Sequence, residues 1–221
     1  VQGNEGAAAL EKVFEQHPAD LSFVELADYR GLKKALTLLV REHYAPVLTA
    51  ITAEERLSGF SRFRILTPLR HGPWGVETLN HLVERLLAEH TGLETKSDWY
   101  EGRPVLVEEN DYALGLYNGD IGVVHGGQCW FPRQEGGLRA VAPSLLPSHR
   151  SAWALTVHKA QGSEFGAVLF SMPDRDTPVL VRELVYTALT RARRRVTVLG
   201  LREVFAKACA RQELRGSGLA L

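Results

Sequence analysis

The stretch from Ser151 to Gly200 constrains the fold more than any other part of the chain. It contains three short apolar runs, at Trp153–Val157, Ala167–Met172 and Val196–Leu199. Each run has the length of a strand that is buried on both faces, as the strands of a parallel sheet are. A helical pattern lies between the second and third runs, with Pro178 near its first turn and Ala188 near its end. This alternation predicts an α/β fold built on a parallel sheet.

A polar segment, His158–Phe165, follows the first of these runs and reads HKAQGSEF. Ligands of open α/β sheets bind outside the carboxyl ends of the strands. This segment is therefore expected at the ligand-binding edge of the sheet, where the strands end. His158 and Lys159 can donate to phosphate oxygens, and Thr156 can add a hydroxyl contact. Gly162 lets the backbone approach a ligand closely. These residue types favour an anionic ligand.

Two further residues fit the same chemistry. Glu164 is an acceptor suited to a sugar hydroxyl, and Arg191 has a planar fork that matches phosphate. An arginine brought to a γ-phosphate from a neighbouring domain stabilises transition-state charge. Taken singly, the His-Lys pair is also typical of a solvated loop. Arg191 is also typical of a cation that complements the dipole at the end of a helix, and we interpret Arg193–Arg195 in that way.

Taken together, the motifs resemble a known family. TVHKAQGSEF followed by ELVYTALTRARRRV resembles motifs V and VI of superfamily 1 helicases, in that order. The sequence of these motifs is most similar to that of the RecD family, the alpha subunits of exodeoxyribonuclease V. ILTPLRHGPWGVETLN (Ile65–Asn80) resembles the motif IV region of that family, and Pro104–Val124 resembles its strand-plus-NGD segment. The resemblance extends from Arg62 to the C-terminus, with Ala160 standing where the family often has Ser.

The resemblance implies the second RecA-like, P-loop-NTPase-type motor domain of an ATP-dependent 5′-to-3′ DNA helicase and exonuclease subunit that acts in double-strand break repair and recombination. A small SH3-like β-barrel would be inserted in this domain. ATP and Mg²⁺ would be bound mainly by a separate N-terminal motor domain that carries the P-loop. The implied partners are single-stranded DNA, that N-terminal motor domain, and the beta and gamma subunits of a heterotrimer.

The resemblance also implies roles for individual residues. Arg70 and Arg191 are expected to converge on the γ-phosphate of one nucleotide, with Gly162 and Glu164 beside it. The residues expected to contact DNA are Thr156, His158, Lys159, Gln161 and Asn118. Without the resemblance, Arg70 reads as a surface arginine in the Pro68–Gly75 turn, between a buried strand at Arg62–Leu69 and a helix at Glu77–His90 that ends at Gly92.

Composition divides the chain. From Ala113 to Pro147 there are many glycines, turn pairs and short apolar runs, which is typical of tight antiparallel hairpins. We therefore predict a first motor segment over residues 1–112, the barrel insertion over 113–150 and the rest of the motor domain over 151–221. Trp130 and Phe131 are interpreted as barrel core. Helices are expected at Asn4–Gln16, Gly31–Tyr44, Val47–Leu57 and Glu203–Arg211, with a short strand or loop at Leu21–Leu26 and a loose tail at Leu214–Leu221.

Several features narrow the function. No G-x-x-x-x-G-K-[ST] motif occurs, so we expect a fragment that does not hydrolyse ATP alone. The formal net charge is +0, so any DNA binding must come from a local patch. The 2 cysteines, Cys129 and Cys209, are far apart and predict neither a zinc site nor a disulfide framework. No apolar run reaches transmembrane length, and a cytoplasmic protein is expected. A non-catalytic RecA-like binding module and a stand-alone RecD-like helicase are the alternative functions.

Overall fold

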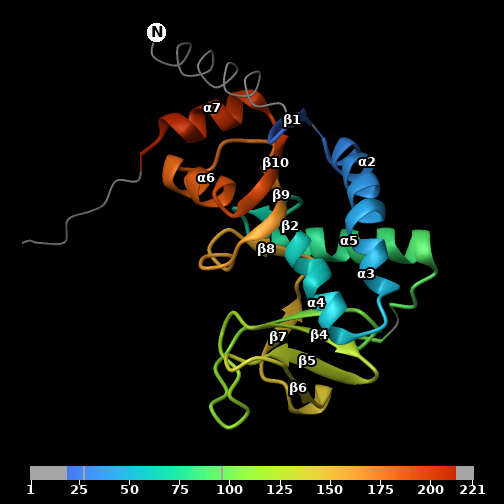
Figure 1. Ribbon diagram of the computed structural model, residues 1–221. Helices are drawn as coiled ribbons and strands as arrows, with labels where there is room; N and C mark the ends of the chain where they lie inside the picture. The colour runs from blue at the N-terminus through green and yellow to red at the C-terminus, as the bar shows by residue number, and fades with distance from the viewer. Residues whose placement is uncertain (1–18, 27, 96, 213–221) are drawn as a thin grey trace, which may run out of the picture.

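The computed structural model describes residues 19–26, 28–95 and 97–212, which form two β-sheets and the helices around them (Figure 1). The helix predicted at Asn4–Gln16 and the tail at Leu214–Leu221 lie outside the described residues.

The main sheet has five strands in the order β1-β10-β9-β2-β8, and every neighbouring pair is parallel. Its strands are β1 (Leu21–Glu25), β2 (Phe63–Thr67), β8 (Ala154–Thr156), β9 (Phe165–Ser171) and β10 (Ala192–Gly200). The apolar runs of the sequence supply β8, β9 and β10, and the weakly alternating segment near the N-terminus is the edge strand β1. The predicted α/β fold with a parallel sheet is confirmed.

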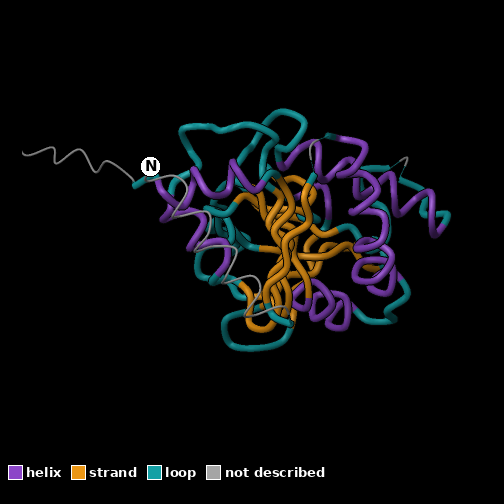
Figure 2. The backbone as a smooth tube through the Cα atoms, turned by 90° about the horizontal axis from the view of Figure 1, so that it is seen from above, coloured by secondary structure: helices purple, strands orange, loops and turns teal. Residues whose placement is uncertain are grey.

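Helices cover both faces of this sheet, as Figure 2 shows from above. The helical elements are α2 (Tyr29–Leu39), a π-helical turn (Val40–Tyr44), α3 (Ala45–Leu48), α4 (Ala53–Arg62), α5 (Val76–Thr91), α6 (Arg182–Leu189) and α7 (Arg202–Ala210). Side chains alternate between the faces along each strand. Ile65 therefore packs in the core that contains α2, α4 and α5, whereas Leu66 packs in the core that contains α6 and α7.

The helix boundaries show which sequence signals were decisive. The predicted C-terminus of α5 is confirmed, since Gly92 has φ 72° in the left-handed region and its N–H bonds to the Ala88 carbonyl. The single helix predicted over Val47–Leu57 is wrong. The chain breaks after Leu48 and restarts at Ala53, because Thr52 and Glu55 form a reciprocal capping box at the start of α4.

The second sheet is antiparallel, in the order β6-β5-β4-β3-β7. Its strands are β3 (Pro104–Val107), β4 (Ile121–His125), β5 (Gln128–Pro132), β6 (Leu138–Val141) and β7 (His149–Ser151). Its position in the chain differs from the predicted one, because β3 belongs to this sheet and pairs with both β4 and β7. The sheet thus begins at Pro104, before the boundary expected at 113. Phe131 lies in its core, and Trp130 is partly buried against the main core.

A chain of polar side chains joins the two sheets. The Tyr100 hydroxyl donates to Glu84 Oε1 of α5 at 2.7 Å and accepts from Trp153 Nε1 at 2.8 Å. The Ser151 hydroxyl of β7 donates to the same carboxylate oxygen at 2.6 Å, and Arg103 Nε donates to Ser151 Oγ at 2.9 Å. Burial raises the pKa of the Tyr100 phenol, so this group stays a neutral donor. The network fixes β7 and the entry to β3 against α5.

Replacing Tyr100 by Phe removes the central hydroxyl of this network while keeping the ring. We expect Tyr100→Phe to lower the free energy of unfolding by about 1–3 kcal/mol, because the Trp153 indole N–H and the Glu84 carboxylate each lose a partner in a poorly solvated place. Urea denaturation of the chain measures this. Tyr186→Phe, at a side chain that is 69% exposed, is the matched control and should change stability by less than about 0.5 kcal/mol. Equal unfolding curves for the two variants would contradict the expectation.

Candidate functional site

The carboxyl edge of the parallel sheet brings together most of the predicted DNA-binding residues. β2 ends at Thr67 and β8 at Thr156, which are register partners. The segment after β8 turns sharply: the Ala160 N–H donates to the Thr156 carbonyl at 3.1 Å, and the Lys159 N–H donates to Thr156 Oγ1 at 3.3 Å. His158 and Gln161 are exposed on this turn. Thr156, His158 and Lys159 therefore lie in one compact turn at the carboxyl edge of the sheet.

Asn118 joins this group from the second sheet. It lies in the loop of residues 108–120 that connects β3 to β4, and its Oδ1 accepts a hydrogen bond from Lys159 Nζ. The Asn118 N–H in turn donates to Asn110 Oδ1 at 2.8 Å. Two predicted DNA-binding residues that are far apart in sequence are thus in direct contact.

Arg70 also lies at the carboxyl edge, just after β2, and acidic side chains surround it. Its Nε is 3.7 Å from Glu77 Oε1, and its Nη2 is 3.5 Å from Glu108 Oε1. The same Glu108 oxygen is 2.6 Å from Nη2 of Arg150, on β7. A hydrogen bond with His71, at 2.8 Å, holds the pKa of the Glu77 carboxyl below its usual range. The guanidinium of Arg70 is thus directed toward Glu77 of α5 and toward Glu108, which links the two sheets. The sequence did not indicate Glu108 and Arg150.

Two other residues expected to contact the nucleotide, Glu164 and Arg191, lie at the other end of the strands. Ser163 and Glu164 lead into β9, and Arg191 directly precedes β10. The Phe165 N–H donates to the Arg191 carbonyl at 2.8 Å. Arg191 Nη1 donates to the Ser163 carbonyl at 3.2 Å, and its Nε donates to the Thr187 carbonyl at 3.1 Å. Arg191 and Glu164 are therefore neighbours at the amino edge of the sheet.

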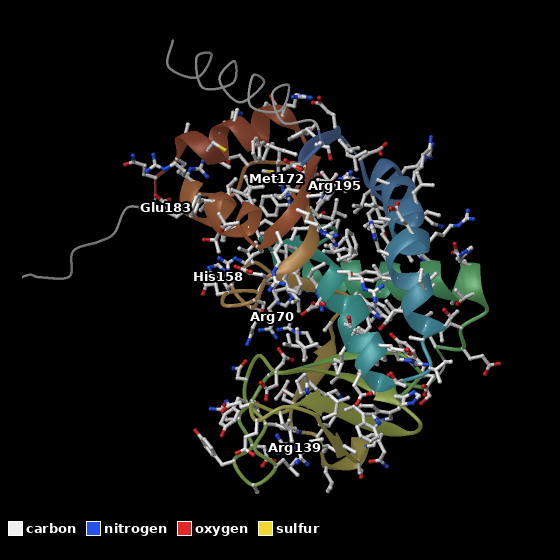
Figure 3. The ribbon with its side chains drawn as sticks, viewed as in Figure 1. Arg70, Arg139, His158, Met172, Glu183 and Arg195 are labelled. Atoms are coloured by element: carbon white, nitrogen blue, oxygen red, sulfur yellow. The ribbon has the colours of Figure 1, made fainter. Side chains whose placement is uncertain are left out.

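The predicted convergence of Arg70 and Arg191 is wrong. Ala192 pairs with Phe165 at the start of β9, whereas Leu66 pairs with Phe170 near its end. At roughly 3.3 Å per residue, the five steps from Phe165 to Phe170 separate these rows by about 16 Å, and Arg70 lies further on. Parallel strands place the start of β10 and the end of β2 at opposite edges, which motif order alone does not reveal. In Figure 3 the labelled Arg70 and His158 lie near the level where the two sheets meet.

The interpretation of Arg193–Arg195 as a helix end is also wrong. α6 ends at Leu189, and the three arginines are exposed residues of β10, at a register shift between Ala192 and Arg195. Arg193 Nε is 2.9 Å from Glu164 Oε2, so this arginine pairs with an expected nucleotide ligand. Pairing with β9 extends β10 through Arg193–Arg195, although the composition of these residues is typical of the end of a helix.

A cavity of about 510 Å³ opens beside the carboxyl edge, with lining residues that include His158, Gln161, Thr187 and Arg211. Arg211 is held by Asp176, at 3.0 Å from its Oδ1, and this contact keeps the pKa of the Asp176 carboxyl below its usual range. Among the described residues no group of three or more His, Cys, Asp or Glu side chains is placed to hold a metal ion. Cys129 and Cys209 are free, and burial raises the pKa of each thiol to about 11. No helix in the described part of the chain is long and apolar enough to cross a membrane.

Comparisons with known proteins agree with the motif order. Residues 151–199 match the UvrD-like helicase C-terminal domain. The chain is 34% identical to the RecBCD enzyme subunit RecD of Haemophilus influenzae, over 94% of this chain and 35% of that protein. It is 42% identical to the RecBCD enzyme subunit RecD of Mycobacterium tuberculosis, over 74% of this chain and 29% of that protein. The ATP-dependent RecD2 DNA helicase of Deinococcus radiodurans is 37% identical, over 74% of this chain and 24% of that protein.

Among solved structures, Bacteroides Pif1 bound to single-stranded DNA is 16% identical, over 71% of this chain and 48% of that chain, with a TM-score of 0.40. A likeness at that score supports no argument about function.

The sequence matches define a part of a superfamily 1 helicase, in which residues 151–199 match the UvrD-like C-terminal domain. Within that class the chain belongs to the RecD family. It spans about a third of the length of the RecD relatives that it matches.

The two ion pairs of Glu108, with Arg70 and with Arg150, predict a measurable effect on stability. Glu108→Gln keeps the shape of the side chain but removes the charge that separates Arg70 from Arg150. We expect a loss of about 1 kcal/mol in the free energy of unfolding, because both contacts are only partly buried and the two cations then repel each other. Urea denaturation at low salt measures the loss, which should shrink at high salt. The control is Glu109→Gln at the adjacent exposed residue, and a loss of the same size there would contradict the assignment.

Proposed function

We propose that the chain is the second RecA-like motor domain of an ATP-dependent 5′-to-3′ DNA helicase, the alpha subunit of an exodeoxyribonuclease V that acts in double-strand break repair and recombination. The antiparallel sheet is its SH3-like insertion. One observation carries the proposal: the segment of residues 156–164 runs from the carboxyl edge of the sheet to the amino edge. Its first residues include Thr156 and Lys159, which would bind DNA, and the Ser163 carbonyl near its end accepts from Arg191 Nη1.

The amino edge is the nucleotide side. ATP would lie between this edge and a P-loop motor domain, which would also hold Mg²⁺. The carbonyls of Thr187 and Ser163 fix the Arg191 side chain, so little rotamer entropy remains to be lost when it meets a γ-phosphate. Its charge would stabilise the transition state of phosphoryl transfer. Glu164 would accept from the ribose, beside Gly162, whose φ of 82° lies in the left-handed region. Arg70 has no part in this site.

The carboxyl edge is the DNA side. The Thr156 hydroxyl, the His158 imidazole and the Lys159 ammonium would donate to successive backbone phosphates, with the amides of Gln161 and Asn118 beside them. Donors of this kind contact the sugar-phosphate backbone and do not discriminate between bases. Binding should therefore be sensitive to salt and nearly independent of sequence.

The segment of residues 156–164 would couple the two sides. A movement of Arg191 toward a γ-phosphate pulls on the Ser163 carbonyl to which it donates. The turn that follows Thr156 is tight, so a displacement at Ser163 shifts the Lys159 ammonium and the Thr156 hydroxyl together. ATP binding would close the cleft between this domain and the P-loop motor domain, and ATP binding and release would thus change the contacts with DNA.

The RecD relatives are RecBCD subunits, which supports the beta and gamma subunits as proposed partners. The other proposed partners are single-stranded DNA and the N-terminal motor domain. The RecD2 relative keeps a stand-alone helicase as the second candidate function. Co-purification of the parent protein with beta and gamma subunits from the same cells would separate the two.

The nucleotide side is tested by Arg191→Ala in a protein in which this chain is joined to its P-loop motor domain. We expect the steady-state ATPase rate to fall by about 10³-fold or more, because the charge that stabilises the transition state is lost. Affinity for single-stranded DNA should stay within about twofold. The control is Arg41→Ala, at an exposed arginine of the π-helical turn, which should keep full turnover. Wild-type ATPase in the Arg191 variant would favour the non-catalytic binding module.

The DNA side is tested by Lys159→Ala, measured as fluorescence anisotropy of a labelled single-stranded oligonucleotide over a range of salt concentrations. We expect weaker binding and a salt slope reduced by about 0.7, the share of one lost phosphate contact on single strands. Lys34→Ala, at an exposed lysine of α2, removes the same charge elsewhere and should leave the slope unchanged. An unaltered slope in the Lys159 variant would remove this residue from the DNA grip.

A further inference from the structure

Two large aromatic side chains are exposed on the loop of residues 108–120. Tyr112 is 78% exposed and Tyr117 is 45% exposed. Their ring centroids are 6.2 Å apart, and the rings stand edge to face at 74°. In that geometry one ring presents its edge and the other a single face, so the pair leaves flat aromatic faces directed at solvent.

The loop that carries them is well ordered by its own hydrogen bonds. The Asp111 N–H donates to the Leu116 carbonyl at 2.8 Å, and the Leu116 N–H returns the bond to the Asp111 carbonyl at 2.9 Å. Asp111 Oδ1 also accepts from the Leu114 N–H at 2.9 Å. The Leu116 side chain is completely buried and anchors the loop in the core of the antiparallel sheet. The two tyrosines are therefore held in position before any ligand arrives, which lowers the entropy cost of binding.

One of the tyrosines is adjacent in the chain to a residue of the proposed DNA contact. Tyr117 precedes Asn118, whose side chain accepts from Lys159 Nζ. Asn110 connects both ends of the arrangement, because its Oδ1 accepts from the Asn118 N–H at 2.8 Å and its Nδ2 donates to the Tyr112 hydroxyl at 3.3 Å. A strand of DNA whose phosphate meets Lys159 would thus have its bases within reach of the exposed rings.

We propose that Tyr112 and Tyr117 form a base-stacking site for single-stranded DNA on the antiparallel sheet. The inference rests on the proposed DNA-binding function of the carboxyl edge and adds the part of the ligand that this edge does not contact. Phosphate donors recognise charge alone, whereas an exposed aromatic face binds the flat surface of any base. The site therefore accepts pyrimidines and purines alike, and it strengthens binding without adding a salt-dependent term.

The structure supports stacking more than a hydrogen-bonding role for these side chains. Stacking requires an uncovered ring, and Tyr112 has the most exposed ring of the exposed tyrosines, which are Tyr29, Tyr112, Tyr117 and Tyr186. Tyr29 and Tyr186 stand on helices α2 and α6, whereas Tyr112 and Tyr117 share one loop and one edge-to-face contact. Two adjacent aromatic rings on a loop whose Asn118 contacts the Lys159 ammonium match the composition of sites that bind single strands.

The experiment compares two oligonucleotides of equal length, oligo(dT) and the same backbone without bases, by fluorescence anisotropy with the complete chain. For the double variant Tyr112→Ala/Tyr117→Ala we expect affinity for oligo(dT) to fall roughly tenfold to a hundredfold, the range that one or two lost stacking contacts give. Affinity for the abasic backbone, and the salt slope, should not change. Tyr112→Phe/Tyr117→Phe keeps both rings and should bind oligo(dT) as the wild type does. Tyr186→Ala is the exposed-tyrosine control.

The possible results are distinct. If the double alanine variant binds oligo(dT) as tightly as the wild type, or loses affinity for both oligonucleotides equally, the stacking site is overturned. If the phenylalanine variant loses as much as the alanine variant, the hydroxyls act and stacking is overturned. Lys159→Ala, measured in the same series, should weaken binding of both oligonucleotides. If it weakens neither, the proposed phosphate grip fails, and a base-selective loss in the tyrosine variant would then stand alone.

Discussion

The parallel direction of all five strands in the main sheet is the constraint on which the candidate site depends. In such a sheet every strand begins at one edge and ends at the other, so each loop is assigned to an edge by its place relative to a strand. Thr156 ends a strand that His158 and Lys159 follow, whereas Glu164 and Arg191 precede a strand. The chemistry is thereby divided into two groups at opposite ends of the strands.

The short connection between β8 and β9 links the two groups of residues at opposite edges of the sheet. It leaves one edge at Thr156 and enters the other at Phe165, with backbone hydrogen bonds that keep it compact. A helix-containing crossover would be longer and would separate the two groups by a layer of packing. Here the Lys159 N–H donates to the Thr156 hydroxyl at one end of the connection, and the Arg191 guanidinium donates to the Ser163 carbonyl at the other. The nucleotide and DNA sides that we propose would communicate through a few peptide units.

The antiparallel sheet contributes through its attachment to the parallel sheet. The network of Tyr100, Glu84, Ser151 and Trp153 fixes it to α5, and Glu108 joins Arg70 to Arg150 nearer the carboxyl edge. These contacts leave the loop of residues 108–120 next to the turn after β8. Asn118 reaches the carboxyl edge, with Tyr117 next to it in the chain, only because the two sheets are held in this orientation. Since buried hydrogen-bonded groups are costly to unpair, the orientation is a stable feature of the chain.

The sequence by itself determined the local elements and the family. The apolar runs identified β8, β9 and β10, the glycine at position 92 marked the end of α5, and the ordered motifs identified a superfamily 1 helicase of the RecD family. These signals are local, because strand burial, helix capping and motif spacing act over a few residues. Only the tertiary structure decided that β3 joins the antiparallel sheet, that Arg193–Arg195 extend a strand, that Lys159 meets Asn118, and that Arg70 and Arg191 lie at opposite edges. Each of these depends on which distant segment pairs with which. A one-dimensional pattern does not carry that information, since strand pairing and ion pairs form between residues that the sequence separates widely.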